Sequence, residues 1–185
     1  VCSAATVFAA AFAYLAWLQF QTTTIPGYDG YYHIKFAELL PAIGFSGEFP
    51  WAAQSIWATS FSDKELGFHL LLVPFARLGD GAAGMKWATV LLGAAIATSF
   101  YLVLALNRLR FPLLWAVLLF ASGPHFLIRL GLPRPHLLSM LLLLWNLHLL
   151  LHQRRTQLAA LTCVYSLSYT AFHLPLALAL AVSAY

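Results

Sequence analysis

The chain has 185 residues, of which 62% are hydrophobic and only 9% are charged, and its mean hydropathy is +0.80. Soluble domains carry about 25% charged residues, so this composition excludes an ordinary soluble domain and predicts an integral membrane protein. The formal net charge of +4 does not indicate a nucleic-acid partner, because the basic residues are scattered along the chain.

The apolar residues come in blocks close to the roughly 20 residues that a helix needs to cross a bilayer, with Pro and Gly at the block ends. We therefore expect an all-α fold, a polytopic transmembrane helix bundle. The expected spans are about 1–20, 85–106, 112–128, 137–151, 158–172 and a truncated span at 174–185. The chain starts without Met and stops inside an apolar run, so we expect it to be part of a longer protein.

The longest connection, residues 21–84, follows the first expected span, and long connections commonly carry function. It contains all six acidic residues of the chain: Asp29, Glu38, Glu48, Asp63, Glu65 and Asp80. Within it we expect a short helix from Tyr31 to Leu40. A second apolar helix, from Gly67 to Leu78, is too short to cross and is therefore expected to be interfacial or re-entrant.

Arginine pairs in the later connections predict the orientation. Arg108 and Arg110 follow one expected span, and Arg154 and Arg155 follow the next span but one. The positive-inside rule places both pairs on the cytoplasmic side of a multi-pass protein. Residues 21–84 and the turn 129–136 are then expected on the non-cytoplasmic side.

Polar side chains that can carry chemistry gather on this expected outer face. They are Asp29, His33, Asp63, Glu65 and His69 from the long connection, and Arg129, Arg134 and His136 from the later turn. Arginine binds phosphate through two parallel hydrogen bonds, whereas a carboxylate takes a proton from a hydroxyl group or binds a divalent cation. The combination suits a site for a phosphorylated lipid.

These residues also have purely structural interpretations, which the sequence leaves open. Asp29 can form a turn or cap a helix. The run 63–65 can be a solvated group of charges, and His69 can pack on an apolar helix. Arg129 and Arg134 can anchor the chain at a membrane surface.

Other polar positions are expected to be structural. Asn146 and His148 are interpreted as interhelical hydrogen-bond partners. The sequence contains no His/Cys pattern with zinc spacing, no Gly-rich phosphate loop and no Ser nucleophile elbow.

Three stretches, in this order, resemble the GT-C superfamily of polytopic glycosyltransferases, which includes the catalytic subunit of oligosaccharyltransferase and the protein O-mannosyltransferases. The stretches are Tyr28-Asp29-Gly30-Tyr31-Tyr32-His33, Asp63-Lys64-Glu65-Leu66-Gly67-Phe68-His69-Leu70-Leu71 and Phe126-Leu127-Ile128-Arg129-Leu130-Gly131-Leu132-Pro133-Arg134-Pro135-His136. The resemblance covers essentially the whole chain, but only the first half of a typical member. It implies a GT-C-like bundle with a long external first loop that contains short interfacial helices.

The resemblance also implies a function: transfer of a sugar from a polyprenyl-phosphate-linked donor to an acceptor on the non-cytoplasmic face. The implied partners are the lipid-linked donor, membrane lipids and other membrane proteins. The implied catalytic residues are Asp29, Glu65 and Asp63, and the implied substrate-binding residues are Tyr31, Tyr32, His33, His69, Arg129, Arg134 and His136. The alternative is a catalytically inactive GT-C-like membrane subunit or scaffold.

One departure from the family concerns the metal. The resemblance implies a divalent cation, Mg²⁺ or Mn²⁺, bound by Asp29. Where oligosaccharyltransferases tend to place an acidic pair in the second external loop, this chain has Arg134-Pro135-His136. The departure argues against a metal and favours a guanidinium or imidazole group on the donor phosphate. Either way, we expect Asp29 to lie close to Arg134.

Overall fold

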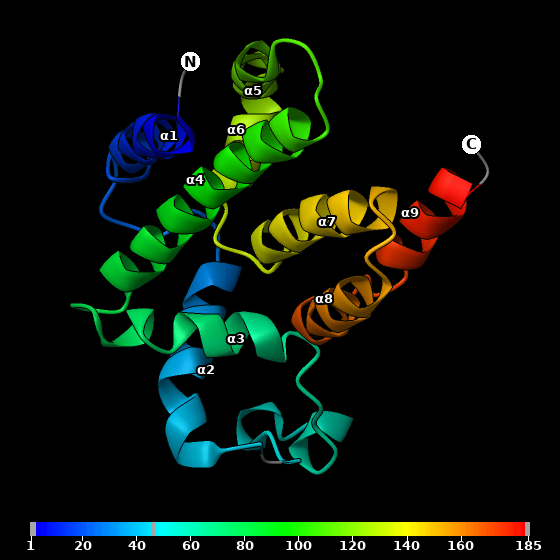
Figure 1. Ribbon diagram of the computed structural model, residues 1–185. Coiled ribbons are helices and arrows are strands. Elements are labelled where there is room, and N and C mark those ends of the chain that lie inside the picture. The colour runs from blue at the N-terminus through cyan, green and yellow to red at the C-terminus, as the bar shows by residue number, and fades with distance from the viewer. Residues whose placement is uncertain (1–2, 46, 184–185) are drawn as a thin grey trace.

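The computed structural model describes residues 3–45 and 47–183, and within these ranges the secondary structure is helical (Figure 1). The helices are α1 (Ala4–Gln19), α2 (Asp29–Ile43), α3 (Leu66–Leu72), α4 (Ala82–Leu106), α5 (Pro112–Ala121), α6 (Pro124–Gly131), α7 (His136–Leu151), α8 (Arg155–Ser168) and α9 (Leu174–Ser183). Three short 3-10 helices, η1 (Pro50–Ala52), η2 (Ile56–Ala58) and η3 (Phe75–Arg77), lie between α2 and α4. The outer ends of the first and last expected spans, residues 1–2 and 184–185, lie outside the described part.

The expectation of a polytopic transmembrane bundle is wrong. Among the described helices only α4, with 25 residues, is by itself long and apolar enough to cross a membrane. The expected spans 1–20 and 137–151 are helices of 16 residues, and the spans 158–172 and 174–185 are helices of 14 and 10 residues. These lengths fall short of the roughly 20 residues that a crossing needs.

The expected span 112–128 is divided into α5 and α6, which meet at an angle of 88°. The break falls at Gly123, whose φ of 145° is open to glycine, and at Pro124, which starts α6. Counted as one broken span, this pair would be a second crossing. The apolar composition therefore continues through turns that interrupt the helices.

Helix α4 is the central element of the fold (Figure 1). It packs along α1 and α7, and its N-terminal half also contacts α2 and η3. Its buried residues Met85, Leu92 and Ile96 belong to the main hydrophobic core, together with Phe68 of α3 and Tyr165 of α8. Of its most apolar window, 56% is buried inside the molecule, so much of its hydrophobic character serves the core.

Two hydrogen bonds tie α7 to its neighbours, as expected for Asn146 and His148. The Thr162 hydroxyl of α8 donates to Asn146 Oδ1 over 2.8 Å. Asn107, which ends α4, lies with its Nδ2 atom 3.1 Å from Nδ1 of His148. The prediction of interhelical hydrogen-bond partners is confirmed for both residues.

The short helix expected from Tyr31 to Leu40 is confirmed, although α2 is longer at both ends. The helix expected from Gly67 to Leu78 is divided into α3 and η3. Helices α2 and α3 pack together below α4 in Figure 1, and the start of α2 touches the α6–α7 turn. A Cβ atom at Gly30 would lie only 2.5 Å from Cγ of Pro133, so glycine permits this approach.

Candidate functional site

An ion pair joins the first turn of α2 to the α6–α7 turn. Nε of Arg134 donates to Oδ2 of Asp29 over 2.9 Å. The Asp29 side chain is 52% exposed and the Arg134 side chain 40%, so both remain accessible to a ligand. The expected meeting of a carboxylate after the first helix with a cation of the later turn is confirmed. The alternative interpretation, in which Asp29 caps a helix, is not confirmed, because no side chain forms a capping hydrogen bond at the start of α2.

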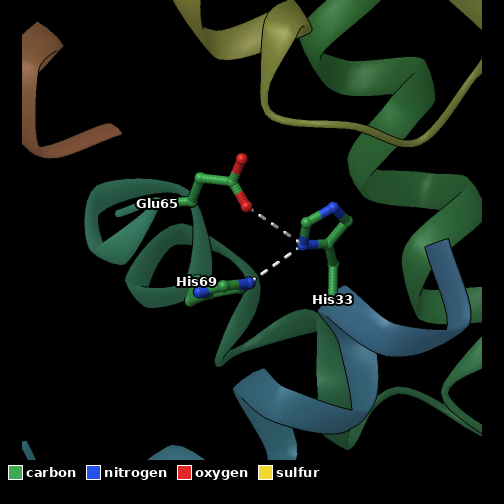
Figure 2. A group of neighbouring side chains, drawn as sticks. All are labelled: His33, Glu65 and His69. Atoms are coloured by element: carbon green, nitrogen blue, oxygen red, sulfur yellow. Dashed lines mark hydrogen bonds and ion pairs between the residues drawn. The ribbon is translucent and has the colours of Figure 1, made fainter. Parts of the chain in front are cut away.

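A buried cluster of imidazoles and carboxylates lies beside this pair. Nδ1 of His69 is 2.8 Å from Oδ2 of Asp63, and Nε2 of His69 is 2.9 Å from Nδ1 of His33. The same His33 nitrogen lies 3.9 Å from Oε2 of Glu65. Figure 2 shows His33 on α2 pointing toward Glu65, which directly precedes α3, and toward His69 on α3. His69 is fully buried and His33 is 5% exposed.

Local sequence explains how the cluster is assembled. Oδ1 of Asp63 accepts a hydrogen bond from the backbone nitrogen of Glu65 over 2.9 Å, and this turn precedes α3. Glu65 and His69 are four residues apart, so they share one face of the helix. Asp29 and His33 have the same spacing on α2. One face of α2 therefore carries the exposed ion pair and leads into the buried cluster.

Burial keeps His33 neutral. Desolvation is the main reason why the pKa of His33 falls from 6.5 to about 3, and the charges of His69 and Arg134 act in the same direction while Asp63 opposes them. Asp29, the partner of Arg134, and His33 lie about one helical turn apart on α2. The ion pair and the buried cluster are therefore neighbours along α2.

The neighbouring acidic groups are also perturbed by burial. Desolvation raises the pKa of Glu65, with Asp63 adding to the rise and with His69 and a hydrogen bond from Thr170 opposing it. Desolvation, together with the charges of Asp63 and Glu65, raises the pKa of Tyr32 to about 12. The Tyr32 phenol therefore stays protonated, and its ring packs edge-on against His33 and His69.

The remaining residues with implied binding roles have structural contacts. The Tyr31 hydroxyl accepts a hydrogen bond from the backbone nitrogen of Ile25 over 3.1 Å. Nε2 of His136 donates to the backbone carbonyl of Arg129 over 2.9 Å and so closes the α6–α7 turn. Burial lowers the pKa of His136; the hydrogen bond to the Arg129 carbonyl opposes this effect, and the positive charges of Arg129 and Arg134 add to it.

The residues around Asp29 do not fit the implied Mg²⁺ or Mn²⁺ ion. The Asp29 carboxylate is occupied by Arg134 rather than by further acidic ligands. In the part of the chain that the structure describes, the one group of three ligand residues with atoms within 4.8 Å of one another is His33, Glu65 and His69. The search for zinc spacing missed this group because its ligands come from two elements. The i, i+4 spacing of Glu65 and His69 was the available signal.

Two buried polar residues were also missed by sequence reasoning. Gln19 is 6% exposed, and its Nε2 atom has no partner among the described residues. Lys86 is 2% exposed, donates to the backbone carbonyl of Thr22 and lies 5.3 Å from the ring centre of Phe20. Gln19 ends an apolar block and Lys86 lies within one, and a polar residue at such a position was the available signal.

Gln19 lines an apolar pocket of about 350 Å³ between α1, α4 and α6. The pocket extends to Pro26 and Leu132, which precede Asp29 and Arg134 by a few residues. The apolar pocket and the polar site are therefore neighbours.

Comparison with known proteins found no match: no family model, no curated protein and no solved structure is similar to the chain.

Proposed function

We propose that the chain transfers a sugar from a polyprenyl-phosphate-linked donor to an acceptor on the non-cytoplasmic face. One observation carries the proposal: an accessible carboxylate–guanidinium pair, Asp29 and Arg134, adjoins an apolar pocket of about 350 Å³. A lipid-linked sugar has the matching structure, because its phosphate joins an apolar chain to a polar sugar.

The donor would occupy both parts of the site. Its phosphate would bind Arg134, whose guanidinium group can form two parallel hydrogen bonds with phosphate oxygens. The exposed Arg129 in the last turn of α6 would add a second positive charge. The first units of the lipid chain would lie in the pocket against Leu15, Leu127 and Leu130.

The chemistry follows from exchanging one partner of the ion pair. When the donor phosphate binds the Arg134 guanidinium group in place of Asp29, the Asp29 carboxylate is released. It can then accept the proton of the acceptor hydroxyl group. Arg134 meanwhile stabilises the negative charge that develops on the departing phosphate. The partly buried Asp63 and Glu65 hold the other side of the site in place.

The test uses the full-length protein in lipid vesicles with a panel of radiolabelled polyprenyl-phosphate hexoses and a panel of acceptors that carry hydroxyl groups. Release of polyprenyl phosphate is measured. Asp29→Asn keeps the shape but removes the base, so we expect turnover to fall by about 10²–10⁴-fold with donor binding retained. Arg134→Gln should weaken donor binding itself.

The matched control is Glu38→Gln on the same helix. Glu38 forms an exposed ion pair with Lys35 at 3.0 Å and has no contact with the site. This variant should release polyprenyl phosphate at the wild-type rate. Wild-type turnover by Asp29→Asn would contradict the proposed reaction.

A second candidate function is binding without transfer, as in a catalytically inactive subunit. It is favoured by the same ion pair, because Arg134 neutralises the Asp29 carboxylate at rest. It predicts that the wild-type protein binds donors of the panel, releases polyprenyl phosphate from none of them, and loses binding in Arg134→Gln.

A further inference from the structure

We propose that His33, His69 and Glu65 bind a first-row transition-metal ion of the zinc type, with Asp63 holding His69 in the ligating orientation. This site differs from the Asp29 site that the family resemblance implies. The proposal goes beyond sugar transfer and does not depend on it.

The ligand atoms already lie at nearly suitable distances. Nδ1 of His33 is 2.9 Å from Nε2 of His69 and 3.9 Å from Oε2 of Glu65, and all three atoms lie within 4.8 Å of one another. A tetrahedral zinc ion with bonds of about 2.0–2.2 Å separates its ligand atoms by about 3.3–3.6 Å. Side-chain rotations that move each ligand atom by roughly 1 Å convert the metal-free arrangement into the tetrahedral one.

Asp63 fixes the tautomer that ligation needs. Its Oδ2 atom lies 2.8 Å from Nδ1 of His69, so this nitrogen carries the proton and donates it to the carboxylate. The lone pair of Nε2 then points toward His33. A carboxylate behind the distal nitrogen is the usual support of a metal-ligating histidine.

Metal binding replaces one hydrogen bond and leaves the proton count of His33 unchanged. Without the ion, Nδ1–H of His33 donates to Nε2 of His69. With the ion, the proton of His33 moves to Nε2 through solvent, and both facing nitrogens offer lone pairs. Glu65 supplies the third ligand as a carboxylate.

The charge balance of the cluster favours a bound cation. Asp63 and Glu65 place two carboxylates in the interior, with side chains only 13% and 23% exposed. The neighbouring cations are engaged elsewhere, because Lys64 lies over the ring of Trp57 at 5.6 Å and Arg134 pairs with Asp29. A divalent ion between the imidazoles would supply the missing positive charge.

The ligand types select the class of metal. Two imidazoles and one carboxylate favour zinc and its first-row neighbours, whereas Mg²⁺ and Ca²⁺ prefer oxygen ligands alone. Three protein ligands leave one coordination position open, which is typical of catalytic rather than structural zinc sites. The partly exposed Glu65 lies on the side from which water or a substrate group can reach that position.

The experiment measures metal binding without any sugar donor. The full-length protein is stripped with a chelator and titrated with Co²⁺ as a spectroscopic probe. We expect one Co²⁺ per chain with the visible absorption of a tetrahedral site, displaced by one equivalent of Zn²⁺ and not by millimolar Mg²⁺. His33→Gln and Glu65→Gln should each abolish this stoichiometric binding.

Asp63→Asn tests the supporting role separately, because it leaves all three ligands in place. We expect it to weaken Co²⁺ binding by about 10–100-fold. The control is His125→Gln, which changes an exposed histidine outside the cluster and should leave binding unchanged. Circular dichroism verifies that each variant is folded.

Two results would overturn the proposal: a folded wild-type protein without stoichiometric Co²⁺ binding, or wild-type binding by both His33→Gln and Glu65→Gln. Neither result bears on the sugar-transfer experiment, which is decided by Asp29→Asn.

Discussion

Gly30 is the residue on which the contact between α2 and the α6–α7 turn depends. A side chain at this position would meet Cγ of Pro133 at 2.5 Å and Cγ2 of Ile25 at 2.6 Å. Neither neighbour is the far end of a flexible side chain. The glycine therefore acts by its small size, and it places the adjacent Asp29 within reach of Arg134.

We predict that Gly30→Ala destabilises the protein by about 1–3 kcal/mol, the usual cost of overpacking, and separates Asp29 from Arg134. Thermal unfolding in detergent measures the first effect. Gly47→Ala is the control, because a Cβ atom there meets nothing within 4 Å. Equal melting temperatures for wild type and Gly30→Ala would contradict the prediction, because the α6–α7 turn would then accommodate the added methyl group without loss of stability.

His136 gives the stability a defined pH dependence. Burial lowers its pKa in the folded protein below the usual 6.5. Below about pH 6.5 the unfolded chain therefore takes up a proton that the folded chain does not, and the unfolding free energy falls by at most about 1.4 kcal/mol per pH unit until the lowered pKa is reached. Above pH 6.5 the contribution is constant.

The measurement is denaturant unfolding between pH 7.5 and 5. His136→Gln can still donate to the Arg129 carbonyl but does not titrate, so its unfolding free energy should fall less steeply than that of wild type. The exposed His125→Gln serves as control and should follow the wild-type curve. Parallel curves for wild type and His136→Gln would contradict the prediction. The pKa of His33 is also lowered in the folded protein, so His33 adds to the loss of stability at low pH. Wild type and His136→Gln both contain His33, so its contribution cancels in their difference.

At the scale of elements, the contact between α7 and α8 rests on a buried amide. Asn146 is 1% exposed, donates to the Leu142 carbonyl and accepts from the Thr162 hydroxyl. We predict that Asn146→Ala costs about 1–3 kcal/mol, because it leaves the Thr162 hydroxyl unpaired.

A double-mutant cycle with Thr162→Val tests this prediction by denaturant unfolding. The double variant removes both polar partners, so it should be less destabilised than the sum of the single variants. Additive effects would indicate that the two residues act independently.

The elements differ in how far the sequence determines them. The existence of α2 and the position of α4 follow from polar-to-apolar boundaries, and the pairing of Asp29 with Arg134 was expected from the order of the segments. Span lengths were overestimated, because hydropathy records composition and not helix continuity, as the break at Gly123 shows. The contact of His33 with His69 depends on how α2 packs on α3, which no local pattern specifies.

On the scale of the whole molecule, apolar side chains remain exposed on several helices. They include Leu114 and Trp115 on α5, Leu167 on α8 and Leu176 and Leu180 on α9, each at least 50% exposed. Contiguous apolar surface marks contact with another protein or with a membrane. Membrane association therefore stays a prediction, and the side of the membrane that residues 21–84 face stays one as well.

The ion pair between Asp29 and Arg134 also has a consequence for selectivity. In the proposed reaction, a phosphate that binds Nε of Arg134 displaces a carboxylate that is already in place, so small free anions such as inorganic phosphate compete with Asp29 for this nitrogen. A ligand whose hydrocarbon portion gains additional contacts in the neighbouring hollow can overcome this internal competitor. The resting protein would thereby discriminate against abundant soluble phosphates before any reaction begins.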